Sequence, residues 1–304
     1  MTTLFSWFWS TFTGAAFIFL ASVNSNLFAA VSSQYCGTEQ NFISLSAEKL
    51  QDAALDDGTE VGFSQRDLTS GLVVSRSKQQ SVAIGFNFQY TIIDVDDSIT
   101  PMTNGHLHNW NFPVSAHRKG SDHTLDYYLA PVISVSSNGL KNPDLLDNES
   151  FQLWAGAIYR KSLSKKSGWL VGFRSDHRFG DYRVYPVAGI CWQPNQDWYL
   201  QLALPDFSIS RYFSSGIKIK LFAGPEGNRW HVFSADTTNS SDFTYSTIIS
   251  GISVEWQLNP TVSVALDAIQ HSARELSFAL EDGTPVETNA QSSTGFSVSL
   301  GLLF

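Results

Sequence analysis

Two groups of residues have side chains and a spacing that could support metal binding. His106 and His108 lie two residues apart, which in a β-strand places both imidazoles on one face. Such a pair can ligate a metal ion, but the sequence specifies no third ligand, so we expect no metal site. Asp94, Asp96 and Asp97 form a small acidic cluster that lacks the glycine and the terminal glutamate of a calcium-binding loop. We interpret this cluster as a solvated loop.

A serine followed by asparagine and glycine suggests a different chemistry, nucleophilic catalysis. In hydrolases with an HxSNG motif, the histidine is the base that activates the serine. Ser137, Asn138 and Gly139 match the last three positions, but Val135 occupies the position of the histidine. We interpret the segment as a polar turn, and we expect no enzymatic activity, no catalytic residues and no cofactor.

The composition excludes several classes of protein. Of the 304 residues only 15% are charged, whereas soluble globular chains average about 25%. Aromatic residues make up 13%, which argues against long disorder because disordered chains are poor in aromatics. The net charge of −9 argues against nucleic-acid binding, which needs a basic surface. Beyond residue 30 no stretch approaches the roughly 20 apolar residues of a membrane-spanning helix.

The N-terminal segment has the features of an export signal. Residues 12–23 form a mostly apolar run that is too short to span a bilayer but has the length of a signal-peptide core. We therefore expect residues 1–29 to be a cleaved signal peptide and the protein to be exported in a Gram-negative bacterium. In an oxidising compartment Cys36 and Cys191 could pair, and two unpaired thiols remain equally open.

Most of the remaining chain alternates between apolar and polar residues with the period of two that is typical of β-strands. In residues 80–93 the even-numbered positions are apolar or aromatic, and the alternation recurs at residues 151–160, 262–268 and 295–304. Segments of about ten such residues separated by turns are typical of a transmembrane β-barrel, with apolar side chains facing lipid and polar side chains facing the lumen. A soluble β-sandwich alternates as well.

Three features favour the barrel over the sandwich. The chain ends on an aromatic residue preceded by apolar residues at every second position, which resembles the terminal-strand signal of bacterial outer-membrane barrels. This assembly signal comprises Phe296, Val298, Leu300, Leu302 and Phe304. Long and short connections alternate along the chain, as barrel topology requires. Five tryptophans lie next to expected periplasmic turns, at a membrane interface: Trp169, Trp192, Trp198, Trp230 and Trp256.

We predict an all-β fold, a transmembrane antiparallel β-barrel of about 12 strands within a range of about 10–14. The barrel is expected at residues 80–304, after an N-terminal periplasmic or plug segment at residues 30–79. In this assignment residues 197–213 form one strand interrupted by a proline, and residues 216–223 and 228–235 form two separate strands. An additional pair of strands before the barrel would raise the number to about 14.

The C-terminal half of the chain resembles a functionally uncharacterised family of bacterial outer-membrane β-barrel proteins. The resemblance covers about residues 180–304 and is carried by residues 197–205 (DWYLQLALP), 217–224 (IKIKLFAG), 250–259 (SGISVEWQLN) and 295–304 (GFSVSLGLLF). It implies the barrel fold and a location in the outer membrane. The family has no known catalytic residues that could be assigned to positions in this sequence.

Alternation also assigns a set of charged side chains to the lumen. These are Arg160, Arg174, Asp176, Asp181, Arg183, Lys218, Lys220, Arg229, Glu255 and Asp267. Two interpretations stay open. The charges pair across strands and fill a closed or plugged barrel, or part of the lumen holds water and the excess of basic residues favours anionic solutes.

The sequence thus predicts an integral outer-membrane protein that acts either as a small-solute channel or as a structural membrane component. One alternative is a surface interaction protein that works through external loops at residues 94–105, 137–149 and 281–292. Another is a soluble periplasmic all-β binding protein. The expected partners are outer-membrane lipid, lipopolysaccharide and the barrel-assembly machinery, with no nucleic acid, and the oligomeric state stays open.

Overall fold

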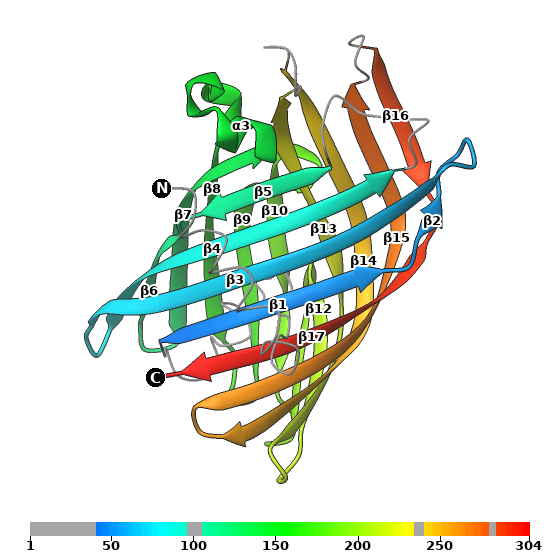
Figure 1. The fold of residues 1–304 in the computed structure, drawn as a ribbon. Helices are drawn as coiled ribbons and strands as arrows, with labels where there is room; N and C mark the ends of the chain where they lie inside the picture. The colour runs from blue at the N-terminus through cyan, green and yellow to red at the C-terminus, as the bar shows by residue number, and fades with distance from the viewer. Residues whose placement is uncertain (1–40, 96–104, 234–239, 280–283) are drawn as a thin grey trace.

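The computed structural model describes residues 41–95, 105–233, 240–279 and 284–304, and its strands form one β-sheet (Figure 1). The strands are β1 (Phe42–Leu50), β2 (Ala53–Ala54), β3 (Glu60–Arg76), β4 (Gln80–Val95), β5 (His106–Asn111), β6 (Val114–Lys119), β7 (His123–Ser136), β8 (Phe151–Ser162), β9 (Ser167–Phe179), β10 (Asp181–Trp192), β11 (Trp198–Leu204), β12 (Phe207–Tyr212), β13 (Ile217–Phe233), β14 (Ser240–Asn259), β15 (Val262–Ala279), β16 (Pro285–Ala290) and β17 (Ser293–Leu303). Three short helical segments follow β7, namely α3 (Ser137–Lys141), η1 (Pro143–Leu145) and η2 (Asn148–Ser150).

Antiparallel pairing closes the sheet into a barrel. β1 pairs with β3 on one side and with β17 on the other, so the first and last strands are neighbours. Three barrel strands are interrupted, because β1 and β2 both pair with β3, β5 and β6 with β4, and β16 and β17 with β15. The break between β5 and β6 falls at Pro113, which has no N–H for the ladder. The described residues therefore form a closed antiparallel barrel of 14 strands.

The connections indicate which way the barrel faces. Phe42 and Phe304 lie at one end, where the connections are short turns such as residues 77–79 and 120–122. At the other end the chain makes longer connections, among them residues 137–150 with α3. In outer-membrane barrels the short turns are periplasmic and the long loops extracellular. The end that carries α3 is therefore the extracellular end.

The barrel begins earlier in the chain than the sequence predicted. β1 and β3 are barrel strands, so the expected boundary at residue 80 is wrong, and the expected number of about 12 strands is two too low. Ser44, Ser46 and Glu48 in β1 are buried and alternate with outward-facing residues, but this strand has only 9 residues, so its alternation is a short signal. The predicted signal peptide and Cys36 lie outside the described residues.

Two further differences concern turns. β11 and β12 form a hairpin around Pro205 and Asp206, where one interrupted strand was expected. Conversely, β13 runs straight through Gly224 and Gly227, where the sequence predicted a break between strands. These glycines permit close approach, because a Cβ at Gly227 would lie 2.3 Å from the carbonyl oxygen of Tyr245. The hairpin adds one strand to the expected number and the continuous β13 removes one, so these two differences leave the number of strands unchanged.

The outward-facing side chains form an apolar surface around the barrel. Its large exposed apolar residues include Ile84, Leu129, Leu153, Val171, Val184, Ile190, Leu202, Leu221, Ile252, Val254, Leu266, Phe296, Val298, Leu302 and Phe304. A closed sheet pairs its backbone groups internally, as lipid requires. No helix in the described parts of the chain is long and apolar enough to cross a membrane.

Four of the five tryptophans expected beside periplasmic turns lie near the periplasmic end, and Trp230 does not. Trp192 ends β10 there, Trp256 lies three residues before the end of β14, and both are about half exposed. Trp230, by contrast, is buried in the extracellular half of the barrel. Its expected place beside a periplasmic turn is wrong because the turn before residue 228 does not exist.

Candidate functional site

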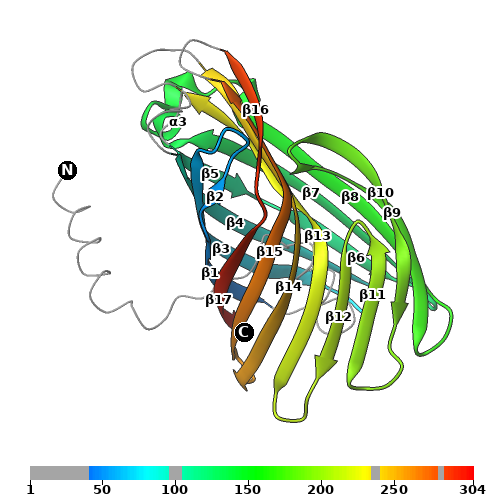
Figure 2. The same ribbon diagram turned by 90° about the vertical axis from the view of Figure 1, so that its right-hand side faces the viewer.

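The short hairpin of β11 and β12 leaves the extracellular half of β13 without a strand neighbour on one side (Figure 2). β12 pairs with β13 only as far as Ala223, although β13 continues to Phe233. Beyond Ala223, β13 lies against β7, where His231 bridges Val135 in parallel register. The barrel is therefore pinched along a seam between β13 and β7 in its extracellular half.

Polar side chains replace the missing strand along this seam. A buried backbone N–H or C=O without a partner is costly, so the free edge of β13 must be satisfied. The side chains that do so are Ser134 and Gln152 on the carbonyl of Arg229 (2.5 and 2.7 Å), Ser136 and Asn138 on the backbone of Phe233 (3.1 and 3.0 Å), and Arg178 on the carbonyl of Pro225 (2.6 Å). The seam is held by side-chain hydrogen bonds rather than by a β-ladder.

An apolar cluster fills the extracellular end of the interior. We call it the closure cluster, and it comprises Leu50, Leu55, Val61, Phe63, Ile93, Leu107, Trp230, Val232, Phe243, Tyr245, Leu276, Phe278 and Ala290. Phe243 stacks on Phe278 with ring centroids 6.0 Å apart, and Phe63 stacks on Tyr245 at 5.1 Å. Close packing of this kind leaves little room for water. The cluster closes the interior toward the outside.

Beneath the closure cluster the interior is polar. Glu48 is buried and its Oε1 lies 2.9 Å from Nε2 of His271. Asp67 accepts hydrogen bonds from Ser46 (2.5 Å) and from Gln65 (3.2 Å). These carboxylates were not predicted, because their strands were expected outside the barrel. The visible signal was the alternation of small polar and apolar residues in residues 42–50.

A small cavity of about 40 Å³ lies in this polar layer. Gln65, Asn87, Asn109, Glu226 and Asn228 are among the residues that line it. The volume admits water but not a solute molecule. The barrel interior is thus nearly filled by side chains at this level.

Several charged residues expected in the lumen lie on the inward side of their strands and pair there. Arg160 forms an ion pair with Asp126, and Lys218 Nζ lies 2.7 Å from Glu255 Oε2. Asp267 is buried and accepts a hydrogen bond from Ser297 at 2.6 Å. Lys220 was also expected in the lumen, and its Nζ lies 5.2 Å from the centroid of the Phe222 ring.

The tip of the β11–β12 hairpin joins a second charged group. Asp206 Oδ2 lies 2.7 Å from Arg174 Nη1, and Asp206 Oδ1 lies 2.7 Å from Arg178 Nη2. Asp176 is buried and accepts a hydrogen bond from the Tyr185 hydroxyl at 2.7 Å. Arg174 and Asp176 were expected in the lumen, whereas Asp206 was missed because its turn was interpreted as part of a strand.

Three of the expected lumen residues lie elsewhere. Asp181, Arg183 and Arg229 line a groove of about 840 Å³ between the tip of the β9–β10 hairpin and the outward-facing side of β13 to β16. Arg229 lies on the side of β13 opposite to the buried Trp230, and its Nη2 lies 2.7 Å from Asp242 Oδ2. The alternation of apolar and polar residues does not reveal the pinch. At the pinch β13 lies further inward, and the tip of the β9–β10 hairpin lies over the outer side of β13.

The revised set of interior charges is acidic rather than basic. Asp181, Arg183 and Arg229 leave the set. Acidic residues from β1, β3, β7, β13 and the β11–β12 turn join it, together with two basic residues, Arg178 and Arg274. Among the described residues the acidic side chains are Glu48, Asp67, Asp126, Asp176, Asp206, Glu226, Glu255 and Asp267, and the basic ones are Arg160, Arg174, Arg178, Lys218, Lys220 and Arg274. The basic excess on which a preference for anions depended is absent.

The histidine pair singled out in the sequence does not share a partner. His106 Nδ1 lies 2.5 Å from the Tyr90 hydroxyl, whereas His108 Nε2 lies 2.8 Å from Ser137 Oγ. β5 therefore brings a histidine to the serine whose motif lacked one. Among the described residues no hydrogen-bond partner orients Nδ1 of His108, unlike in a catalytic triad. The absence of enzymatic activity stays a prediction.

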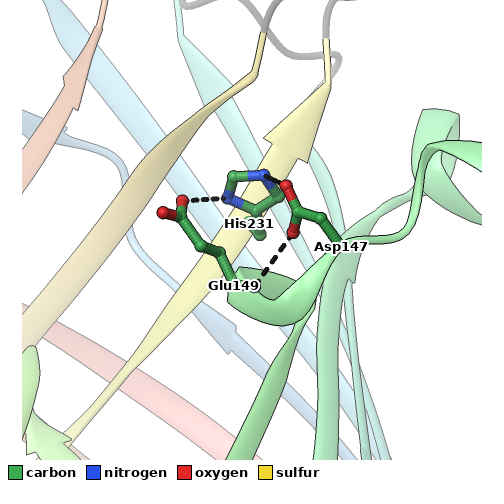
Figure 3. Close-up of side chains that lie close together, drawn as sticks. All are labelled: Asp147, Glu149 and His231. Carbon is green, nitrogen blue, oxygen red and sulfur yellow. Dashed lines mark hydrogen bonds and ion pairs between the residues drawn. The ribbon is translucent and has the colours of Figure 1, made fainter.

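A different histidine lies among carboxylates at the extracellular end of the seam (Figure 3). His231 comes from β13, and Asp147 and Glu149 come from the segment at η2. One potential ligand atom from each residue lies within 4.8 Å of the other two. Within the described residues this is the group whose composition could hold a metal ion.

The closed barrel with its apolar outer surface is the architecture of outer-membrane proteins, and the outer membrane is where this protein resides. The outward side of β17 carries the predicted assembly signal, with Phe296 63% and Phe304 65% exposed. Recognition of this strand by the barrel-assembly machinery stays a prediction.

Solved structures of several membrane barrels are similar to this chain at low sequence identity. They include the toluene transporter TodX of P. putida, at 10% identity, with 90% of this chain and 92% of that chain covered and a TM-score of 0.48. The KdgM porin is 8% identical, with 86% and 99% covered and a TM-score of 0.38. The translocator domain of the autotransporter NalP from Neisseria meningitidis is 9% identical, with 91% and 93% covered and a TM-score of 0.41.

None of the curated proteins matches the chain. The family comparison gives a match over most of the barrel, at residues 67–298, from the middle of β3 into β17. An uncharacterised family was expected from the resemblance of the C-terminal half, and the match extends it over the N-terminal half of the barrel. The chain belongs to the family described as "Domain of unknown function (DUF6268)".

Proposed function

We propose that the protein is a small-solute channel of the outer membrane that is closed in the state described here and that favours cations when open. The observation that carries the proposal is the order of layers along the barrel. A polar interior with an excess of carboxylates lies beneath the apolar closure cluster. Hydrophobic constrictions of this kind gate channels by excluding water.

The buried carboxylates argue for a conducting role over a purely structural one. Removing a charged group from water costs several kcal/mol, and well-packed apolar residues would fill a structural barrel at least as stably. Glu48, which is buried, and Asp67, which is half-buried, occupy positions that apolar residues could fill. Contact with water and cations in an open state would explain why carboxylates stand at these positions. A barrel of 14 strands lies between filled 8-stranded barrels and open 16-stranded porins.

The seam offers a way to open. Apart from the single backbone bridge between His231 and Val135, β13 is held to β7 and α3 by side chains such as Ser134 and Asn138. An outward movement of β13 would therefore break one bridge and no extended ladder on that side. Trp230 and Val232 in the same part of β13 belong to the closure cluster. An outward movement of this segment would therefore withdraw two members of the cluster from the axis.

A solute-flux assay tests the proposal. Wild-type protein in liposomes should give little swelling with small neutral sugars. The double variant Phe243→Ala/Phe278→Ala removes a stacked pair from the closure cluster and should increase the swelling rate. The variant Ile252→Ala, on the outward side of β14, is the matched control and should behave as wild type.

A structural membrane component is the second candidate, favoured by the nearly filled interior. In that case the double variant would remain folded, as judged by migration in SDS gels before and after boiling, and would transport no solute. That result would overturn the channel proposal.

A further inference from the structure

The environment of His231 differs from that of the other interior and surface histidines. Its side chain is only 1% exposed, although it lies on the outward side of β13 at the extracellular end. The η2 segment covers it with Asp147, and Glu149 lies on the opposite side of the ring (Figure 3). β14 adds a third carboxylate, Asp242.

The hydrogen bonds of His231 determine which ring nitrogen carries a proton. Nδ1 lies 3.0 Å from Asp242 Oδ1 in hydrogen-bond geometry. A carboxylate only accepts, so Nδ1 is the donor and Nε2 of the neutral ring is an acceptor. Nε2 is buried, has no hydrogen-bond partner within the described residues, and lies 3.3 Å from Asp147 Oδ2. Two acceptor atoms thus face one another, and only a cation or a proton between them removes the conflict.

The distance between these two atoms suits a shared metal ion. Imidazole nitrogen and carboxylate oxygen bind zinc at about 2.0–2.2 Å, so two such ligands in a tetrahedral site lie roughly 3.4 Å apart. The observed 3.3 Å agrees with that spacing. A histidine ligand commonly donates its other ring N–H to a carboxylate, as His231 does to Asp242.

The charges around His231 and the exposure of Glu149 also favour a metal ion. Asp147, Glu149 and Asp242 carry three negative charges, whereas Arg229 supplies one positive charge, 2.7 Å from Asp242. The excess of two negative charges matches a divalent cation. The Glu149 side chain is 62% exposed, so it can turn toward an ion held by the other two residues.

We propose that His231, Asp147 and Glu149 bind a divalent transition-metal ion, of which zinc is the representative, at the extracellular end of the seam. The mixed imidazole and carboxylate set favours such an ion over calcium or magnesium. Bound metal ties the η2 segment to β13 and so fastens the seam. This site departs from the expectation that the protein holds no metal.

Titration of the untagged full-length chain in detergent micelles with zinc chloride alone tests the proposal. Isothermal titration calorimetry at pH 7 should show saturable binding of about one ion per chain. Asp147→Asn should abolish this binding. Asp242→Asn, which alters the group that positions the imidazole and also removes the partner of Arg229, should weaken it about 10–100-fold. Zinc should also raise the unfolding temperature of the wild type. It should raise the unfolding temperature of each of the two variants by less.

The matched control is His123→Gln, because His123 also lies beside a carboxylate, with its Nδ1 3.0 Å from Asp122 Oδ1, but at the periplasmic start of β7. This variant should bind zinc as the wild type does. His231→Gln should lose binding, and migration in SDS gels before and after boiling reports whether it folds. If His231→Gln does not fold, the variant Asp147→Asn provides the test, because Asp147 is exposed and its replacement should leave the fold intact. Absence of saturable zinc binding in the wild type, or unchanged binding in folded Asp147→Asn, would overturn the proposal and leave a protonated imidazole as the explanation of the contact.

Discussion

Replacement of Asp206 by asparagine should destabilise the barrel strongly, because this turn residue contacts two largely buried arginines. The carboxylate is 18% exposed and contacts two guanidinium groups, that of Arg174 (2% exposed) and that of Arg178 (12% exposed). Removing one partner of a buried ion pair costs about 3–5 kcal/mol, because the remaining charge stays buried. Asp176 remains close to Arg178 and offsets part of the loss. We therefore expect a cost of about 3 kcal/mol for Asp206→Asn.

Urea unfolding in detergent, followed by tryptophan fluorescence, measures this cost. With a slope of about 1–3 kcal/mol per molar urea, the midpoint should fall by about 1 M or more. Asp197→Asn, in an exposed periplasmic turn, is the control and should leave the midpoint unchanged. Adding Arg174→Met to Asp206→Asn should recover part of the loss by removing one unpaired charge. A midpoint for Asp206→Asn equal to that of the wild type would refute the reasoning.

Three further predictions concern other parts of the barrel. Gly227→Ala would place a Cβ 2.3 Å from the Tyr245 carbonyl oxygen and should destabilise the protein by about 1–3 kcal/mol or more, measured by the same unfolding assay. Deletion of Phe304 should lower the amount of heat-modifiable barrel in outer-membrane fractions. The hydrogen bond from His123, followed by the nearby charge of Lys161, lowers the pKa of Asp122 from its ordinary value of 3.8. The difference in stability between the wild type and Asp122→Asn should therefore be present above pH 3.8 and disappear as the pH falls below it.

The sequence predicts the barrel architecture well because alternation is a local signal. The strands at residues 80–95, 151–162 and 293–303 follow the expected faces closely. Strand number was less accurate because β1 and β3 lie before the expected boundary at residue 80. The positions of turns were also less accurate, since they depend on how glycine and proline are interpreted. Pro205 marks a turn in the structure, whereas Gly224 and Gly227 mark close approach within one strand.

The candidate sites could be predicted only in part. Alternation identified Arg174 and Lys218 as inward, because each lies in a regular strand. It could not identify the pinch, which arises when a short hairpin leaves β13 uncovered. The contact of Asp147 with His231 joins residues 84 positions apart across this pinch, so no local pattern reveals it.

The most direct test of the closed, cation-favouring channel is single-channel recording in planar bilayers, comparing the wild type with Phe243→Ala/Phe278→Ala. The proposal predicts a wild type that is closed nearly all the time and a variant that opens frequently and prefers cations over anions. A wild type that is steadily open, a folded variant that never conducts, or a variant that prefers anions would contradict it.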